Sequence, residues 1–168
     1  NKAAVTTAMA LLTSGVYDPN TAAQVAIIIP PLGLGLATVI NKRKFLPELQ
    51  EAGNASLVMG LIGVSEGAIP FAIESPLKVI PANMIGSALG SAIAVGLGAV
   101  NRAPISGFYG WFAVEKWWVY IFAILVGTLT VTALTLLLRK NVSISTANVV
   151  EESNNSNADY FSEDQWEN

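Results

Sequence analysis

Residues 117–138, WWVYIFAILVGTLTVTALTLLL, form a run of 22 mostly apolar residues without a charged side chain. An α-helix needs about 20 such residues to cross the roughly 30 Å of hydrocarbon in a bilayer. Trp117, Trp118 and Tyr120 lie at one end of the run and Arg139–Lys140 at the other, as in an interfacial aromatic belt and a positive flank. The run therefore predicts a transmembrane helix.

The composition also indicates a membrane protein. Of the 168 residues, 52% are hydrophobic and 12% are charged, which is about half the charged fraction of a typical soluble domain. All nine basic residues lie at or before Lys140, whereas half of the twelve acidic residues follow it, so the net charge of −3 reflects the tail. No basic cluster is large enough for a nucleic-acid groove, and we expect no nucleic-acid partner.

The sequence contains neither cysteine nor histidine. This excludes disulfides, thiolate nucleophiles and thiolate metal ligands, together with the commonest general base and metal ligand. We expect no metal and no cofactor. Any phosphoryl group that is carried on cysteine or histidine must be carried by another chain or by a segment outside this sequence.

Two further segments are long enough to span a bilayer. Residues 82–100 are uncharged, and Gly86 and Gly90 would let neighbouring backbones approach closely. Residues 21–40 contain Pro30–Pro31, followed by two glycines. We expect these prolines to interrupt the helix, because proline removes a backbone donor and clashes with the preceding turn.

Shorter apolar segments predict elements that do not span the membrane alone. Residues 3–16 resemble half a helix or a re-entrant arm, and residues 108–114 a second dip or an interfacial stretch. Residues 55–64 and 67–73 are two short apolar runs on either side of Glu66. Non-helical backbone at membrane depth is tolerated where it lines a cavity, so these two runs predict a re-entrant hairpin with Glu66 near its tip.

The expected fold is all-α, a polytopic transmembrane bundle with re-entrant hairpins and interrupted helices. If residues 21–40 run inward, the positive-inside rule is satisfied. The cytoplasmic set is then Lys42, Arg43, Lys44, Lys78, Arg139 and Lys140, and the outer set is Arg102 and Lys116. We expect residues 1–140 to form a membrane-embedded transport domain, truncated at its start, and residues 141–168 to form an acidic, disordered cytoplasmic tail.

Glu66 is the leading candidate for chemistry, because ionisable residues within a membrane are functional candidates by default. The alternative is a structural ion pair with Lys78 or Arg102. A carboxylate can accept two sugar hydroxyls through charge-assisted hydrogen bonds. Lys2 could neutralise a carboxylate or meet a phosphate. Weaker polar contacts could come from Asn1, Thr6, Thr7, Asn83 and Ser106.

Several motifs resemble the fructose-type IIC permease of the bacterial sugar phosphotransferase system. They are NKAA at 1–4, SEGAIPFA at 65–72, SPLKVIPANMIGSALG at 75–90, and Ala103–Pro104 followed by Gly107. That family shows Gly-Gly-Pro-x-Asn-Lys-Ala-Ala, Thr-Glu-Gly-Ala-Ile-Pro-Phe-Ala, Asp-Pro-Leu-Arg-Val-Ile-Pro and Ala-Pro-His-Gly-Gly in the same order. The resemblance covers nearly all of residues 1–138 and implies the C-terminal half of a unit about twice as long.

The resemblance implies that a sugar is bound from outside and carried inward, where the phosphocysteine of a IIB partner phosphorylates it. It implies a bacterial cytoplasmic membrane, surrounding lipids and a homodimer. This chain would be the membrane component of the phosphotransferase, without a phosphoryl-carrying residue of its own. Glu66 would hold sugar hydroxyls and could help to deprotonate the attacking one. The substrate-binding residues implied are Asn1, Lys2, Ser65, Glu66, Gly67 and Ser106.

The sequence departs from the family pattern at several positions. Ser65, Ser75 and Lys78 are mild changes from Thr, Asp and Arg. Ile105 stands where the family has His, and Ser106 where it has Gly, so a polar group is lost. Missing hydroxyl partners change sugar choice by large factors. Fructose, a related hexose, a polyol or a glycoside are therefore all open as substrates.

Two other classes of function remain open. In one, the chain is a proton-coupled secondary transporter with Glu66 as the proton and substrate site. In the other, it is a membrane sensor that binds a ligand without transporting it, for which the acidic tail is the only sign in the sequence.

Overall fold

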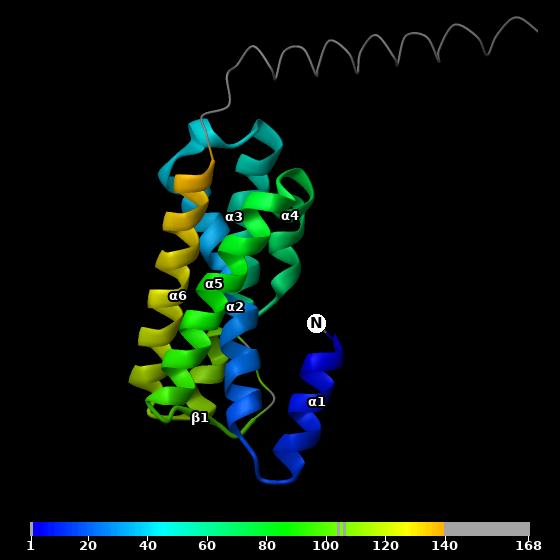
Figure 1. Cartoon of the computed structure of the whole chain (residues 1–168), viewed down its shortest axis with the longest axis vertical. Coiled ribbons are helices and arrows are strands. Elements are labelled where there is room, and N and C mark those ends of the chain that lie inside the picture. Colours follow the sequence, from blue (N-terminus) through cyan, green and yellow to red (C-terminus); the bar gives the residue numbers. More distant parts are fainter. Residues whose placement is uncertain (1, 104, 106, 140–168) are drawn as a thin grey trace, which may run out of the picture.

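The computed structural model describes residues 2–103, 105 and 107–139, and the side chains of all these residues except 2–5, 108 and 111. The described part is almost entirely helical, as predicted (Figure 1). Asn1, Ser106 and the predicted tail at 141–168 lie outside the described residues. The six α-helices are α1 (Lys2–Thr13), α2 (Asp18–Ile40), α3 (Pro47–Ile62), α4 (Ile69–Glu74), α5 (Pro76–Gly96) and α6 (Trp117–Leu138).

Short elements connect these helices. The 3₁₀ helix η1 (Lys42–Lys44) leads into α3, and η2 (Ser65–Ala68) joins α3 to α4. Between α5 and α6 the chain forms β1 (Val100–Asn101), η3 (Phe108–Ala113) and β2 (Val114–Glu115). The two strands pair antiparallel, with Val100 opposite Glu115 and Asn101 opposite Val114. The segment at 108–114, which we expected to dip into or lie along the membrane, is thus mostly a 3₁₀ helix within this connection.

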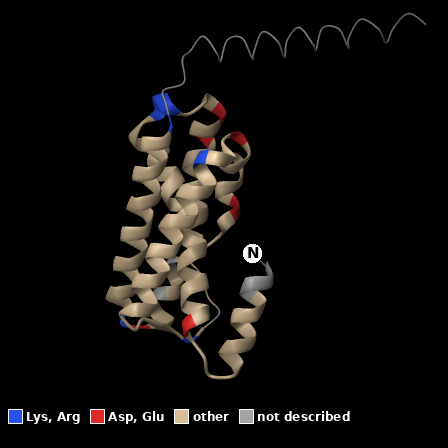
Figure 2. Cartoon of the chain, in the orientation of Figure 1, with Lys and Arg blue, Asp and Glu red and all other residues tan. Residues whose placement is uncertain are grey.

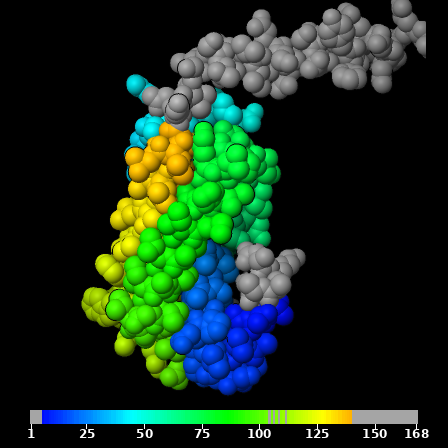
Figure 3. Space-filling view, viewed as in Figure 1, coloured from blue at the N-terminus to red at the C-terminus, as the bar shows by residue number. Residues whose placement is uncertain are grey.

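Three helices of the described part, α2, α5 and α6, are long and apolar enough to cross a membrane. They pack against one another side by side, and Figure 3 shows α5 and α6 next to each other on one face, with part of α2 exposed beside α5. Lys, Arg, Asp and Glu gather at the two ends of the bundle, and its middle is almost free of them (Figure 2). This distribution agrees with three membrane-spanning helices, because charged side chains are costly at the bilayer centre.

The predicted break at Pro30–Pro31 is wrong, because α2 is continuous from Asp18 to Ile40. Proline at position 30 leaves the Ala26 carbonyl without its helical donor. Ser87 of α5 donates to that carbonyl over 3.4 Å, and Ser56 of α3 donates to the Pro31 carbonyl over 2.8 Å. Hydroxyl groups from neighbouring helices thus help to satisfy the backbone around the prolines, which lets the helix continue.

Close packing through small residues is confirmed at α5. A Cβ atom on Gly86 would lie 2.9 Å from the Gly127 carbonyl oxygen of α6. A Cβ atom on Gly90 would lie 3.0 Å from the Ala123 carbonyl oxygen. Both distances are shorter than a side chain tolerates comfortably, so glycine at these positions brings the two helix backbones together.

The sequence suggested that Tyr120 belongs to an interfacial aromatic belt, but the structure places its side chain in the core. Its side chain is buried, whereas Trp117 and Trp118 are exposed, with their rings stacked 4.0 Å apart. Tyr120 lies two residues beyond Trp118 and belongs to the hydrophobic core. Of these three aromatic residues at the start of α6, the two tryptophans are therefore exposed, and Tyr120 contributes to the core.

Candidate substrate site

Helices α3 and α4 form a hairpin with η2 at its turn. Gly63 ends α3 with φ +90° and ψ +32°, the left-handed conformation that glycine adopts most easily. The Val64 amide then bonds back to the Met59 carbonyl over 2.8 Å, and Pro70 lies in the first turn of α4. These residues reverse the chain where the two short apolar runs predicted a turn. The first arm is longer than expected, because α3 begins at Pro47 rather than near residue 55.

Both ends of the hairpin lie at the same end of the bundle. Arg139 at the end of α6 forms an ion pair with Glu74 at the end of α4 and also bonds to the Lys44 carbonyl just before α3. The turn at residues 63–68 lies part-way along the long axis of the molecule (Figure 1). The hairpin thus enters the bundle and returns without crossing its full length.

Glu66 lies in η2 at the turn, and its side chain is exposed. Of the two partners considered from sequence, Arg102 instead pairs with Glu115, with 2.6 Å between Nη2 and Oε1. Among residues with described side chains, Glu66 forms no ion pair with Lys78 either. The structural alternative for Glu66, an ion pair with one of these residues, therefore finds no support.

The two residues flanking Glu66, Ser65 and Gly67, differ in how deeply they are buried. Ser65 is half-buried, and Gly67 is buried against α3. A Cβ atom on Gly67 would lie 3.0 Å from Ser56 Cα and 3.1 Å from its hydroxyl. The hydroxyl of Ser56 in turn bonds to α2 at Pro31. Gly67 therefore lets η2 pack tightly on the hairpin's first arm, and its predicted role in substrate binding remains a prediction.

The motif segment that ends at Gly107 packs against the same hairpin. Gly107 has φ +85°, and its Cα lies so close to α3 that an added Cβ would collide with the Ile62 carbonyl. Ile62 is the last residue of α3, next to Gly63 at the turn. The motif glycine at 107 thus packs on the last turn of α3, just before the SEGAIPFA motif begins at residue 65. Ile105, which replaces the family's histidine, is 46% exposed.

A buried polar network that the sequence analysis missed holds this loop in place. Asn20 of α2 donates to the carbonyls of Asn101 and Ala103, over 3.0 and 3.1 Å. The Asn101 amide bonds to the Thr21 hydroxyl over 2.8 Å, and Gln24 donates to Asn20 over 3.3 Å. Gln24 and Asn20 are four residues apart on α2, but the bonds from α2 to the loop join residues about 80 apart, so no local pattern in the sequence could reveal them.

Two hollows flank these elements. An apolar pocket of about 200 Å³ lies beside Gly107 and Tyr120, and its other lining residues are Ile28, Leu32, Leu61, Ile121, Ile124 and Leu125. This lining offers little to a sugar, whose hydroxyls need polar partners. A more open groove of about 560 Å³ lies between α1 and the bundle and carries two hydroxyl residues, Thr7 and Ser91. Helix α1, which begins at Lys2, rises beside this groove to the level of the hairpin turn (Figure 1).

Known proteins of similar sequence are named as fructose-specific or fructose-like components. The chain is 44% identical over 145 residues to the "PTS system fructose-specific EIIB'BC component" of Rhodobacter capsulatus, covering 84% of this chain and 25% of that protein. It is 44% identical over 147 residues to the "Fructose-like permease IIC component 2" of Escherichia coli K12, covering 85% of this chain and 41% of that protein. The chain is homologous to the fructose-type IIC permeases of the phosphotransferase system.

This homology confirms the resemblance found in the motifs. The chain spans between 25% and 41% of the length of these two relatives. No family model and no solved structure matches it. Together with the three candidate spans, the homology to IIC permeases indicates a multi-pass membrane protein.

In this IIC homologue, the motif regions lie in the hairpin, in α5 and in the loop that packs on the hairpin. SEGAIPFA forms the turn and second arm of the hairpin, and SPLKVIPANMIGSALG forms most of α5. The loop that ends at Gly107 packs on the hairpin's first arm. Asn1 and Ser106 lie outside the described residues, as does the side chain of Lys2. Of the six substrate-binding residues that the resemblance implies, Ser65, Glu66 and Gly67 are fully described, and all three lie in η2. The weaker candidates Thr6 and Thr7 lie in α1, and Asn83 lies in α5.

Proposed function

We propose that this chain is part of the sugar permease subunit of a phosphotransferase system. It binds and translocates a hexose, fructose or a related sugar or polyol, for phosphorylation by a IIB partner. The homology to fructose-specific and fructose-like IIC components carries this proposal. One relative is named as an EIIB'BC component, which supports a IIB partner for this chain. The absence of Cys and His from this sequence is compatible with a phosphoryl group that is carried by that partner.

The hairpin α3–η2–α4 is re-entrant in this proposal. Helix α3 has 16 residues and is about 24 Å long, short of the roughly 30 Å hydrocarbon core. Both ends of the hairpin lie at the end of the bundle that carries Lys42, Arg43 and Lys44. The positive-inside rule makes that end cytoplasmic, in a bacterial cytoplasmic membrane. The turn then lies within the membrane, where exposed backbone requires a polar cavity.

Glu66 is the sugar-binding carboxylate at that turn. It is exposed, and it forms no ion pair with a described side chain. Its oxygens can therefore accept two hydroxyl hydrogen bonds, which are stronger for a charged acceptor than for a neutral one. One of these hydroxyls can be the one that attacks the phosphoryl group, and Glu66 then orients it or takes its proton.

The surrounding residues add weaker contacts in this proposal. Ser65 and the backbone at Gly67 lie beside Glu66 in η2. Asn1, Lys2 and Ser106 would complete the site, and of these three only the backbone of Lys2, in α1, is described. Residues 1–140 form the membrane-embedded transport domain, which works as a homodimer among lipids.

A proton-coupled secondary transporter is the second candidate. The lack of an ion pair at Glu66 among described side chains is compatible with a proton relay as well as with a sugar ligand. The two functions differ in energy source and in product. A phosphotransferase permease consumes phosphoenolpyruvate and releases sugar phosphate inside, whereas a proton-coupled transporter releases unmodified solute.

Uptake of radiolabelled fructose into membrane vesicles tests the proposal. The vesicles should carry the full-length protein together with its IIB partner and the general phosphotransferase components. We expect uptake to require phosphoenolpyruvate and to yield labelled sugar phosphate. The opposite result would be uptake of unmodified sugar, driven by a proton gradient, after the general phosphotransferase components have been removed. That result would overturn the proposal in favour of the second candidate.

A further inference from the structure

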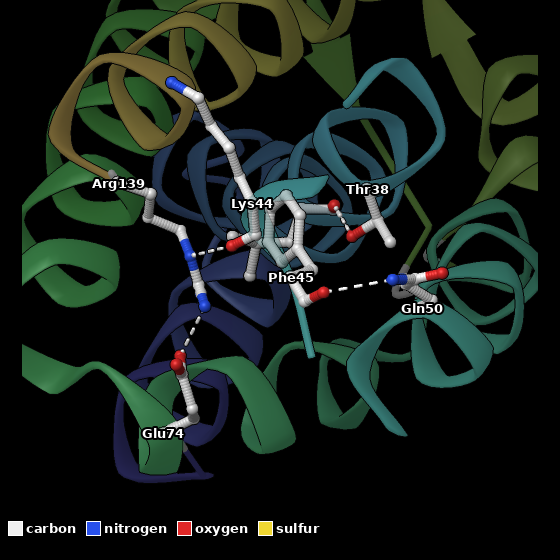
Figure 4. A network of polar contacts seen from close by, with 7 residues as sticks. Thr38, Lys44, Phe45, Gln50, Glu74 and Arg139 are labelled. Carbon is white, nitrogen blue, oxygen red and sulfur yellow. Dashed lines mark hydrogen bonds and ion pairs between the residues drawn. The ribbon is translucent and has the colours of Figure 1, made fainter. Parts of the chain in front are cut away.

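Arg139 is a buried arginine at the end of α6, and it joins three separate parts of the chain (Figure 4). Its side chain is 3% exposed. The Nη2 atom lies 2.7 Å from Glu74 Oε2, at the last residue of α4. The Nε atom donates to the Lys44 carbonyl over 3.2 Å. The guanidinium thus bonds to one residue before the hairpin begins and one where it ends.

Phe45 completes the contact between the two ends of the hairpin. Its ring lies 4.3 Å from the Arg139 guanidinium carbon, within the range of a cation–π interaction. On α4, Phe71 meets the same ring edge-to-face, with centroids 5.9 Å apart. Gln50 of α3 donates to the Phe45 carbonyl over 3.0 Å. Phe45 is therefore held between α6, α3 and α4.

Arginine is suited to this position in a way that lysine is not. Its planar group can donate in two directions and stack on a ring at once, whereas an ammonium is a point charge without a flat face. A buried guanidinium also carries a large desolvation cost, which its partners must offset. Loss of the Glu74 carboxylate would leave the buried Arg139 charge without its ion-pair partner, so the position of Arg139 depends strongly on that contact.

We propose that Arg139 is a positioning residue that fixes both ends of the hairpin to α6 and thereby sets the place of η2. The two arms of the hairpin are unequal, because α3 has 16 residues and α4 only six, so Glu74 is joined to η2 by a short helix. Around the turn, Gly67 against Ser56 and Gly107 against Ile62 are close packing contacts. A shift at the ends would therefore be transmitted to the turn through α4, which has only six residues.

This sequence contains no cysteine, so a thiol introduced into it is a direct reporter once any cysteines elsewhere in the full-length protein are replaced by serine. A single thiol is introduced by Ala68→Cys in η2, a buried position, and its labelling rate with a maleimide is measured in detergent-solubilised full-length protein. A second reporter, Ala123→Cys in the core of α6, is measured in parallel. Glu74→Gln removes the charge that pairs with Arg139. The control Glu115→Gln breaks the exposed ion pair with Arg102 at the other end of the bundle.

We expect Glu74→Gln to speed labelling at position 68 by roughly tenfold, because local opening exposes a site without global unfolding. The rate at position 123 should stay constant, and Glu115→Gln should change neither rate. Arg139→Lys should give a rate at position 68 between those of the unaltered protein and Glu74→Gln, since it keeps the charge but loses the second donor nitrogen and the flat face. An unchanged rate at position 68, or equal acceleration at both positions, would overturn the proposal.

The consequence for transport rests on the proposed function, whereas the labelling result does not. If η2 carries the sugar site, Glu74→Gln should raise the KM for sugar by a larger factor than it lowers the maximal rate. Faster labelling without a change in KM would leave Arg139 as the residue that positions the hairpin and would contradict the assignment of the sugar site to η2.

Discussion

At the scale of single residues, Gly107 links the loop before η3 to the hairpin. Its φ of +85° disfavours a side chain, and an added Cβ would meet the Ile62 backbone. Gly15 offers a matched control, because its φ is +83° and nothing lies within 4 Å of a Cβ added there. Both replacements by alanine incur left-handed strain of about 1–2 kcal/mol, but only the replacement at Gly107 must also displace packed backbone.

We therefore expect Gly107→Ala to lower the melting temperature in detergent clearly more than Gly15→Ala does. Thermal unfolding, followed by tryptophan fluorescence, measures both. Equal losses of stability would show that the contact with Ile62 contributes nothing beyond the backbone conformation.

The identity of the polar residue at the hairpin turn was predictable from the sequence, but the buried polar residues were not. Glu66 stands out because it interrupts an apolar run, and the glycines and proline around it predict the turn. Nothing in the sequence around Asn20 or Asn101 marks either residue as buried. Only the fold brings the Asn20 side-chain nitrogen within 3.0 Å of the Asn101 carbonyl oxygen. Tyr120 was misassigned because its position beside two tryptophans does not reveal which face of α6 is buried.

At the scale of elements, α5 and α6 pack through glycine. We expect Gly86→Ala to destabilise the bundle by about 1–3 kcal/mol, because the new methyl group would press on the Gly127 carbonyl and on Val131. Gly96→Ala is the control, since nothing lies within 4 Å of a Cβ added there. Alanine has the higher helix propensity, so that change should be neutral or stabilising. Urea unfolding in detergent compares the two, and similar losses would argue against the glycine contact.

Helix α2 shows why element boundaries were harder to predict than element types. The rule that proline interrupts a helix describes the helix alone, in which the Ala26 carbonyl has lost its donor. The hydroxyl of Ser87, 61 residues away in sequence, lies 3.4 Å from that carbonyl. A local rule was thus overridden by a tertiary contact. The same sequence reasoning succeeded at Gly63, where bonds between nearby residues end the helix.

At the scale of the whole molecule, the bundle has a definite orientation. Residues 42–46 and the start of α5 lie at one end, and the strand pair β1–β2 lies at the other (Figure 1). We expect a cysteine introduced at Arg43 to be protected from a membrane-impermeant maleimide in intact cells and to react after permeabilisation. A cysteine at Gly98 should react in intact cells. The reverse labelling pattern would show that the protein has the opposite orientation in the membrane, which would contradict the proposed direction of sugar transport.

The most direct measurement of the proposed function is uptake and phosphorylation of labelled fructose by Glu66→Gln in the full-length protein. Glu48→Gln is the matched control, because Glu48 is an exposed acid in the first turn of α3, at the end of the same hairpin away from its turn. With membrane levels equalised, we expect Glu66→Gln to weaken sugar binding roughly 10- to 100-fold, since hydrogen bonds to a charged group contribute about 1.5–3 kcal/mol. Glu48→Gln should behave like the unaltered protein. Unchanged affinity and uptake in Glu66→Gln would contradict the account.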